Sequence, residues 1–440
     1  MQDTPDLLTA ATEVLKMNDR GSYTQPAHGL YPHQWLWDSC FVAIGLRHLD
    51  IERAKSELLS LLRGQWSNGM MPNIIFRDDP KYRTDRNIWR SWINPFAPDG
   101  ITTTGITQPP MLAEAVVRVG AKMEWPERRI WYAAMYPALV KYHEWLYTER
   151  DPHHEGLTLQ IHPWETGLDN TPPWISEMRD HQLPFWITAI KVTRFDKIVN
   201  IFRRDTQSVP MDERFSTIEA LTLFDIQRRL RRKAYDINKI LDHSLLTIED
   251  LAFNSIFIRA NSHLETIATS LRHELPKDLV KNMARTEKAL EELWDPYSSQ
   301  YYSRDFVTHR LLKTPTIATL LPLYAGSITK ERAAQLVRLL ENEQIFGPAF
   351  PIPSVPVNSF WHNPRLYWQG PSWVNMNWLI IDGLKRYGYK DHAAALTEST
   401  LEMVAKAGSY EYFDPRDGSG AGAANFSWTA ALAIDLYKNQ

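Results

Sequence analysis

The sequence predicts an all-α protein folded as an (α/α)6 toroid, a closed double ring of helical hairpins. Segments that are apolar on all sides alternate along the chain with segments that carry one apolar stripe, and strands are predicted only over 157–161 and 300–307. A helix that is apolar on every face is buried, whereas a helix with a polar face lies outside. Modest loops join these segments, so an inner and an outer ring accommodate the pattern. An α-solenoid would alternate in a similar way, but no repeated 34- or 45-residue signature is visible.

Local start signals support the individual helices. The apolar segment 40–49 is followed by the striped segment 51–63, and Asp50 between them is typical of an N-cap. Pro126 opens another helix at a position where its missing N–H costs nothing. In chain order we expect helices over 4–17, 40–49, 51–63, 111–119, 126–149 (where Pro137 could interrupt it), 217–241, 251–271, 277–294, 316–324, 329–342, 373–387, 391–407 and 427–437.

Length and composition favour one domain that binds a small molecule. The 440 residues contain no Gly/Ser-rich linker and no block of charge, so we expect a single domain over 1–440. The chain has 17 Trp against 19 Gly, and aromatic residues make up 12% of it, which suggests flat surfaces kept for a ligand as well as for the core. Aromatic faces suit sugar rings, whose C–H faces are apolar while their rims need hydrogen-bond partners. Association into homo-oligomers stays open.

Charge, cysteine content and motifs exclude several classes of function. The formal net charge is −3 and the basic residues are dispersed apart from the run 228–233, which argues against a nucleic-acid partner. Cys40 is the only cysteine, which excludes an internal disulfide and a thiolate metal site. We find no signal peptide and no apolar run of roughly 20 residues, so we expect a cytoplasmic protein without a membrane partner. Phosphate-binding glycine loops, G-x-S-x-G elbows, dinucleotide fingerprints and metal-ligand histidine spacings are also lacking, so we expect chemistry without a cofactor or metal.

Polar loops rich in aromatic residues precede several predicted inner helices. In a toroid, the N-termini of the inner helices meet at one mouth of the ring with their free N–H groups and positive dipole ends. The loop 162–172 contains Gly167 and two prolines, so it presents Asp169 on a fixed turn. The segments expected to converge with Asp169 are 35–38, Gln108, the region around Arg204, 367–373 and 411–426.

Two acids in these loops are candidates for catalysis. A glycosidase needs one carboxyl that stays protonated and a second carboxylate that activates water or attacks carbon. Asp169 is one candidate, and its alternative role is to cap a turn. Glu411 is the other, because it lies between two tyrosines whose aromatic surface can tune its proton affinity; its alternative is a bond to the glycine-rich loop 418–422. Asp38 is either the N-cap of the helix that follows it or a ligand for two sugar hydroxyls.

The motifs resemble those of glycoside hydrolase family 63 in order and spacing over nearly the whole chain. The similarity is greatest to the compact bacterial branch of mannosylglycerate and glucosylglycerate hydrolases. The motifs that carry it are Gln-Trp-Leu-Trp-Asp-Ser at 34–39, Trp-Glu-Thr-Gly-Leu-Asp-Asn-Thr-Pro at 164–172, Tyr-Trp-Gln-Gly-Pro-Ser-Trp at 367–373, and Glu-Tyr-Phe at 411–413 with Phe-Ser-Trp-Thr-Ala at 426–430.

This resemblance implies an inverting α-glycosidase that releases a hexose from a small α-glycoside such as glucosylglycerate or mannosylglycerate. Asp169 would be the general acid and Glu411 the general base. Tyr31 and Gln108 would stand near the aglycone, with Arg204 a further candidate at the mouth. The residues implied to form the sugar pocket are Trp35, Trp37, Asp38, Trp164, Gly167, Tyr367, Trp368 and Trp373.

Substrate selection depends on loops that are less regular than the motifs. The segments 68–105 and 170–215 are irregular, and we expect them to form a lid over the active site. Three alternatives to a glycosylglycerate hydrolase stay open at this point. They are an α-glucosidase for neutral di- and oligosaccharides, an isomerase of the sugar 2-epimerase type that would need facing histidines, and a non-catalytic carbohydrate-binding toroid.

Overall fold

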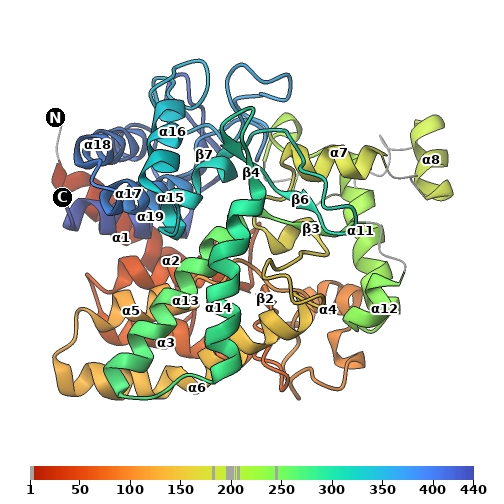
Figure 1. Cartoon of the computed structure of the whole chain (residues 1–440), viewed down its shortest axis with the longest axis horizontal. Coiled ribbons are helices and arrows are strands. Elements are labelled where there is room, and N and C mark those ends of the chain that lie inside the picture. Colours follow the sequence, from red (N-terminus) through yellow and green to blue (C-terminus); the bar gives the residue numbers. More distant parts are fainter. Residues whose placement is uncertain (1–3, 181–183, 195–202, 204, 206–208, 243–245) are drawn as a thin grey trace.

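Six helices form a closed inner ring in the computed structural model, which describes residues 4–180, 184–194, 203, 205, 209–242 and 246–440 (Figure 1). Each inner helix contacts the next one along the chain, and the last contacts the first, which closes the ring. The inner helices are α2 (Leu36–Leu46), α5 (Leu112–Gly120), α13 (Leu251–Leu271), α15 (Pro322–Ala325), α17 (Val374–Arg386) and α19 (Ser427–Lys438).

A second layer of helices surrounds this ring. Each outer helix packs against the inner helix beside it in sequence, and the N-terminal helix packs against the C-terminal one. The two ends of the chain therefore lie near each other in Figure 1. The outer helices are α1 (Thr4–Asn18), α3 (Ile51–Leu62), α6 (Trp125–Glu149), α14 (Lys277–Ala289), α16 (Lys330–Leu340) and α18 (Lys390–Ala407). This arrangement confirms the predicted (α/α)6 toroid.

Burial separates the two rings as the hydrophobic pattern predicts. Every residue of α2 is buried, whereas α3 buries one face only. Burying a large aliphatic side chain stabilises the fold by about 1.5–3 kcal/mol, so the inner ring contributes most of the core. Glycines allow inner helices to approach closely: a side chain at Gly45 in α2 would collide with Ala431 in α19. Gly383 in α17 faces the backbone of Leu323 in α15 in the same way.

Some helix boundaries differ from the predictions. Pro137 lies inside α6 without interrupting it. The segment predicted as one helix over 217–241 divides into α11 (Thr217–Arg232) and α12 (Ile237–Leu241), because Ala234 and Tyr235 between them adopt left-handed backbone angles (φ 51° and 58°). The predicted helix 316–324 begins as a 3-10 turn, η6 (Ile317–Leu320), and the predicted helix 277–294 ends as another, η5 (Leu290–Leu293).

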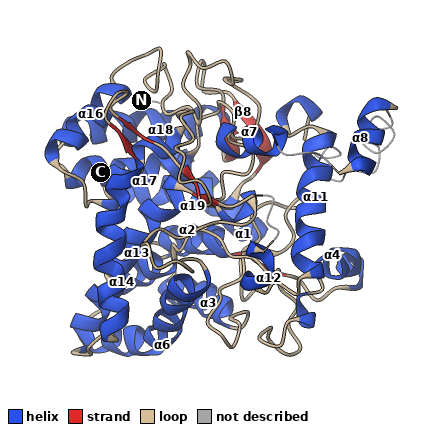
Figure 2. Cartoon of the chain, turned by 45° about the vertical axis from the view of Figure 1, so that its right-hand side comes forward, coloured by secondary structure: helices blue, strands red, loops and turns tan. Residues whose placement is uncertain are grey.

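The strands of the described residues are short and form four antiparallel pairs (Figure 2). The prediction of a strand over 157–161 is wrong, because only Gln160 makes a bridge there, to Ile248. The predicted strand 300–307 is interrupted and pairs with two different partners. The pairs are β1 (Gln34–Trp35) with β2 (Ile74–Ile75), β3 (Ile248–Glu249) with β6 (Arg304–Asp305), β4 (Trp294–Asp295) with β5 (Gln300–Tyr301), and β7 (Tyr410–Phe413) with β8 (Gly420–Ala424).

The two segments expected to form a lid fold into short helices at one side of the ring (Figures 1 and 2). Helix α11 contacts both segments and so links them. The first contains η1 (Pro80–Tyr82), α4 (Arg83–Trp89) and η2 (Ser91–Ile93), and the second contains α7 (Pro172–Asp180), α8 (Phe185–Val192) and η4 (Met211–Glu213). Their function as a lid stays a prediction. Among the described residues, no helix combines the length and apolarity that a membrane span requires.

Candidate active site

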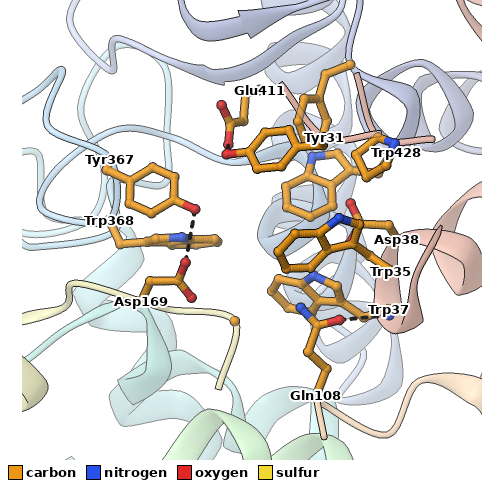
Figure 3. Close-up of a pocket in the computed structure, with 13 residues that line it drawn as sticks. Tyr31, Trp35, Trp37, Asp38, Gln108, Asp169, Tyr367, Trp368, Glu411 and Trp428 are labelled. Atoms are coloured by element: carbon orange, nitrogen blue, oxygen red, sulfur yellow. Dashed lines mark hydrogen bonds between the residues drawn. The ribbon is translucent and has the colours of Figure 1, made fainter. Parts of the chain in front are cut away.

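A small cavity lies at the end of the ring where the inner helices begin (Figure 3). Its empty volume, including the opening to solvent, is about 360 Å³. Ten of its residues were named as site residues from the sequence; Phe426 ends the segment 411–426 that was expected to converge here, whereas Pro26 and Trp428 were not named as site residues. The full lining comprises Pro26, Tyr31, Trp35, Trp37, Asp38, Gln108, Gly167, Asp169, Tyr367, Trp368, Glu411, Phe426 and Trp428.

Asp169 lies on one side of this cavity at the end of a tight turn. The turn follows η3 (Pro163–Glu165) and contains Gly167 with φ +70°, where a side chain would collide with the indole of Trp37. The hydroxyl of Tyr367 donates to Oδ2 of Asp169 at 3.1 Å. Burial raises the pKa of Asp169 to about 7; the hydrogen bond from Tyr367 opposes this shift and the nearby charge of Glu411 adds to it. At neutral pH a large fraction of the Asp169 carboxyl is therefore protonated.

Asn170 joins the Asp169 turn to an aromatic platform. Its side-chain oxygen accepts a hydrogen bond from the backbone N–H of Trp368 at 2.8 Å, and its carbonyl accepts one from the side chain of Gln369 at 3.0 Å. The indole of Trp368 stacks on that of Trp373 with a centroid distance of 3.6 Å and an interplanar angle of 1°. The acid and the platform are thus held in one rigid unit.

Glu411 on β7 is the second carboxyl of the cavity, and it accepts hydrogen bonds from three groups. The Tyr31 hydroxyl donates at 2.8 Å, the Arg214 guanidinium at 2.8 Å and the Ala423 backbone N–H at 3.0 Å. Both side chains of the Arg214–Glu411 ion pair are only 2% exposed. Hydrogen bonds from a charged donor are shorter and stronger than neutral ones, so the Glu411 carboxylate is held in a fixed orientation.

Arg214 was not predicted as a site residue. It follows η4 in the irregular segment 170–215, and its guanidinium lies over the rings of Tyr31 (5.7 Å) and Tyr367 (4.8 Å). These contacts join segments that are far apart in the sequence, and nothing in the local sequence distinguishes Arg214 from other arginines of the segment.

Asp38 faces the cavity from the first turn of α2. The alternative that it is the N-cap is wrong, because Trp35 occupies that position. Burial raises the pKa of Asp38 well above its usual value, and the charges of Glu411 and Asp169 raise it further. In the part of the chain that the structure describes, no other residue donates a hydrogen bond to the Asp38 carboxyl, which is therefore available to a ligand in the cavity.

Gln108 contacts the start of the same helix. Its side-chain oxygen accepts a hydrogen bond from the backbone N–H of Trp37 at 3.3 Å (Figure 3), and its backbone carbonyl accepts one from Tyr142 at 3.1 Å. This arrangement fixes the amide orientation and leaves its NH₂ group as a donor on the cavity side.

Two of the residues predicted to form the sugar pocket lie outside its lining. Trp373 does not line the cavity; it is fully buried behind Trp368, because its indole forms the second layer of the platform. Trp164 is also absent from the lining and packs against Trp89 of α4. Tyr31 does line the cavity, and its hydroxyl donates a hydrogen bond to Glu411. Arg204 lies outside the described residues.

The arrangement combines groups that suit acid–base chemistry on a sugar. Burial raises the pKa of one carboxyl, Asp169, while the other, Glu411, is held in contact with a cation, and both face one small aromatic cavity. No group of three or more metal-ligating side chains occurs among the described residues.

Comparisons with known proteins assign the family. The profile of the mannosylglycerate hydrolase MGH1-like glycoside hydrolase domain matches residues 31–429. A mannosylglycerate hydrolase of Thermus thermophilus is 37% identical, over 96% of this chain and 99% of the relative. The glucosylglycerate hydrolase of Mycolicibacterium hassiacum is 32% identical, over 98% of each chain.

Solved structures support the same assignment. A GH63 mannosylglycerate hydrolase from Thermus thermophilus, in complex with Tris and D-glycerate, superimposes with a TM-score of 0.87 at 36% identity and covers 98% of this chain and 100% of its own. The neutral trehalase of Saccharomyces cerevisiae, at 17% identity with a TM-score of 0.60, shares the fold. These matches confirm the resemblance to family 63 and identify the chain as a glycoside hydrolase that belongs to the mannosylglycerate hydrolase MGH1-like family.

Proposed function

We propose that this enzyme hydrolyses α-mannosylglycerate or α-glucosylglycerate with inversion, using Asp169 as general acid and Glu411 as general base. The observation that carries the proposal is the pair of carboxyls in opposite environments at one small cavity. An inverting glycosidase needs a protonated carboxyl on the leaving-group side and an ionised carboxylate that activates water on the other face of the sugar.

Asp169 suits the first role because its pKa of about 7 leaves the carboxyl partly protonated under neutral conditions. It would donate this proton to the glycosidic oxygen as the bond to the anomeric carbon breaks, so that glycerate leaves as an alcohol. The turn at Gly167 and the hydrogen bond between Asn170 and Trp368 hold the Asp169 carboxyl in place. This removes the entropic cost of orienting the carboxyl in the transition state.

Glu411 suits the second role because its carboxylate is already held by Tyr31 and Arg214. It would take a proton from the water whose oxygen attacks the anomeric carbon. One proton is thus donated to glycerate and one is taken from water, and the second turnover begins after Asp169 and Glu411 exchange protons with solvent.

The aromatic surfaces and Asp38 suit a single hexose. The indoles of Trp35, Trp37 and Trp368 line the cavity and offer apolar faces to the ring C–H groups. Asp38, which receives no hydrogen bond from another described residue, would bind hydroxyls on the rim of the sugar.

Glycerate is supported as the aglycone by the relatives and by the donors of the cavity. Proteins named as mannosylglycerate or glucosylglycerate hydrolases match nearly the full chain, and one related structure is a complex with D-glycerate. The NH₂ group of Gln108 would donate to the glycerate carboxylate. Neutral aglycones would leave such donors unpaired at about 1–3 kcal/mol for each buried group.

The test is a side-by-side assay of released hexose. The purified enzyme is given α-mannosylglycerate, α-glucosylglycerate, maltose, nigerose and trehalose, and kcat/KM is measured for each. We expect at least one glycerate conjugate to exceed every neutral disaccharide by several orders of magnitude. A neutral disaccharide as the best substrate would refute the glycerate proposal, and the D169N and E411Q variants control for a contaminating glycosidase.

A further inference from the structure

The two oxygens of Glu411 differ in their hydrogen bonds. Oε2 accepts from Arg214 Nη2 at 2.8 Å and from the backbone N–H of Ala423 at 3.0 Å. Oε1 accepts from the Tyr31 hydroxyl at 2.8 Å, while its second contact, from Arg214 Nη1, is long at 3.5 Å. A carboxylate has about four acceptor sites, two on each oxygen. The protein therefore fills both sites of Oε2, whereas Oε1 can still accept a hydrogen bond from a water molecule.

We propose that Arg214 is a positioning residue for the general base, and that it occupies Oε2 so that Oε1 is the oxygen that takes the proton from water. This inference rests on the proposed function. In the step itself, the water oxygen forms a bond to the anomeric carbon, the glycosidic bond breaks, and the released water proton moves to Oε1 of Glu411. Arg214 keeps its own protons throughout.

The surroundings of Arg214 hold it in one orientation. Its guanidinium lies against the faces of two tyrosines, Tyr31 and Tyr367, and is 2% exposed. Stacking restricts the planar group, and the planar fork directs two N–H groups at the carboxylate. A lysine at this position would supply the charge without the fork.

Glu213, the residue before Arg214, anchors the backbone segment that positions Arg214. The carboxylate of Glu213 accepts hydrogen bonds from the backbone N–H of Gly422 at 2.8 Å and from Arg365, and the carbonyl of Glu213 accepts one from Tyr412 at 2.6 Å. Gly422 and Tyr412 belong to the same β7–β8 hairpin as Glu411. The segment 211–215 is therefore attached to the hairpin that carries the base.

The charged and titratable groups that influence Glu411 come from several elements. Asp38 and Asp169 are acids at the same cavity, and Arg214 is the cation among the groups that interact with Glu411. Among the described residues, the groups that interact electrostatically with Glu411 include Tyr31, Asp38, Asp169, Arg214, Tyr367 and Tyr412. Removal of Arg214 would leave Glu411 in a cluster of acids and phenols, where its charged form is disfavoured.

The experiment compares R214A, R214K and the wild type in full pH–rate profiles on the better glycosylglycerate. For R214A we expect the acidic limb of kcat to move to higher pH, because the positive charge beside the base is lost. We also expect the plateau kcat to fall roughly 100-fold through misplacement of the base, with KM changed much less. R214K should restore the position of the limb but not the plateau. Added guanidinium should restore part of the R214A rate.

The matched control is R332A. Arg332 lies on the outer helix α16, stacks on Trp294 at 3.7 Å and pairs with Glu291, so its loss removes a similar arginine away from the cavity. R332A should leave the pH–rate profile unchanged. An R214A enzyme with an unmoved acidic limb and no guanidinium rescue would overturn the inference. If R214A does not fold, as judged by circular dichroism, R214K decides, because a wild-type plateau there would also overturn it.

Failure of the proposed function gives a different result. If the wild type cleaves neither glycerate conjugate, the substrate proposal fails, and the same variants can be compared on α-glucosyl and α-mannosyl fluoride, which need only the base.

Discussion

The pH dependence of the reaction should reveal how the hydrogen bond from Tyr367 affects the pKa of Asp169. A general acid is active only when it is protonated, so activity should be lost as the pH rises through the pKa of Asp169, about 7. At pH 7 about half of a group with this pKa is protonated, whereas with the usual aspartate pKa of about 3.9 the fraction would be roughly one in a thousand. Burial of the carboxyl thus increases the competent fraction several hundred-fold.

Replacing Tyr367 by Phe tests this reasoning. The hydroxyl of Tyr367 donates to Asp169 at 3.1 Å and stabilises the ionised form, so its removal should raise the pKa of Asp169. A hydrogen bond to a charged group contributes about 1.5–3 kcal/mol when fully buried, and each pKa unit corresponds to about 1.36 kcal/mol. Because Asp169 is partly exposed to the cavity, we expect a shift of about one unit.

The assay is kcat/KM against pH on the better glycosylglycerate for wild type, Y367F and the control Y387F. Tyr387 donates its hydroxyl to the Ile328 carbonyl beyond the far end of α17, so Y387F should leave the profile unchanged. The alkaline limb of Y367F should move to higher pH. Asp169 and Glu411 interact, so the limb belongs to the pair and the direction of the shift is the informative quantity. An alkaline limb that stays in place or moves to lower pH would refute the reasoning.

Four further variants test other parts of the site. The D169N variant should hydrolyse a glycosylglycerate about 10²–10⁴-fold more slowly than the wild type, but its loss of rate on the matching α-glycosyl fluoride should be far smaller. The E411Q variant should be slow on both substrates. Equal behaviour of the two variants in this kinetic comparison would reject the assigned roles. Q108A should lower kcat/KM for the glycerate conjugate more than for the glycosyl fluoride, and a uniform loss would show that Gln108 only orients the Trp37 backbone. G167A should lower the melting temperature by the equivalent of about 1–3 kcal/mol, because its side chain would meet the indole of Trp37 at φ +70°; an unchanged melt would show that the turn relaxes freely.

The fold was predictable because the hydrophobic pattern of a helix depends on the ring in which it lies: inner helices are apolar on all sides and outer helices on one side. The apolar segment before Asp50 and the striped segment after it became α2 and α3 as expected. The exceptions arise where backbone conformation overrides the pattern, as at Ala234 and Tyr235 with their positive φ. The hairpin β7–β8 was not predicted, since the Gly/Ala-rich β8 lacks the β-branched residues that signal a strand.

The predicted part of the site consists of residues that lie next to the start of an inner helix or in a loop with turn signals. Arg214 could not be predicted, because its importance comes from a pairing with Glu411 across 197 positions. The order of the two stacked indoles was also hidden, since sequence spacing does not say whether Trp368 or Trp373 faces the cavity. Long-range packing determines both.

Time-resolved proton NMR of the released hexose shows whether Asp169 and Glu411 perform an inverting hydrolysis of a glycosylglycerate. The substrates α-glucosylglycerate and α-mannosylglycerate are supplied separately to the wild type and to E411Q. We expect the wild type to release the β-anomer first from at least one substrate, before mutarotation, and we expect E411Q not to do so. Release of the α-anomer first, or no hydrolysis of either glycerate conjugate, would show that the proposed reaction is wrong.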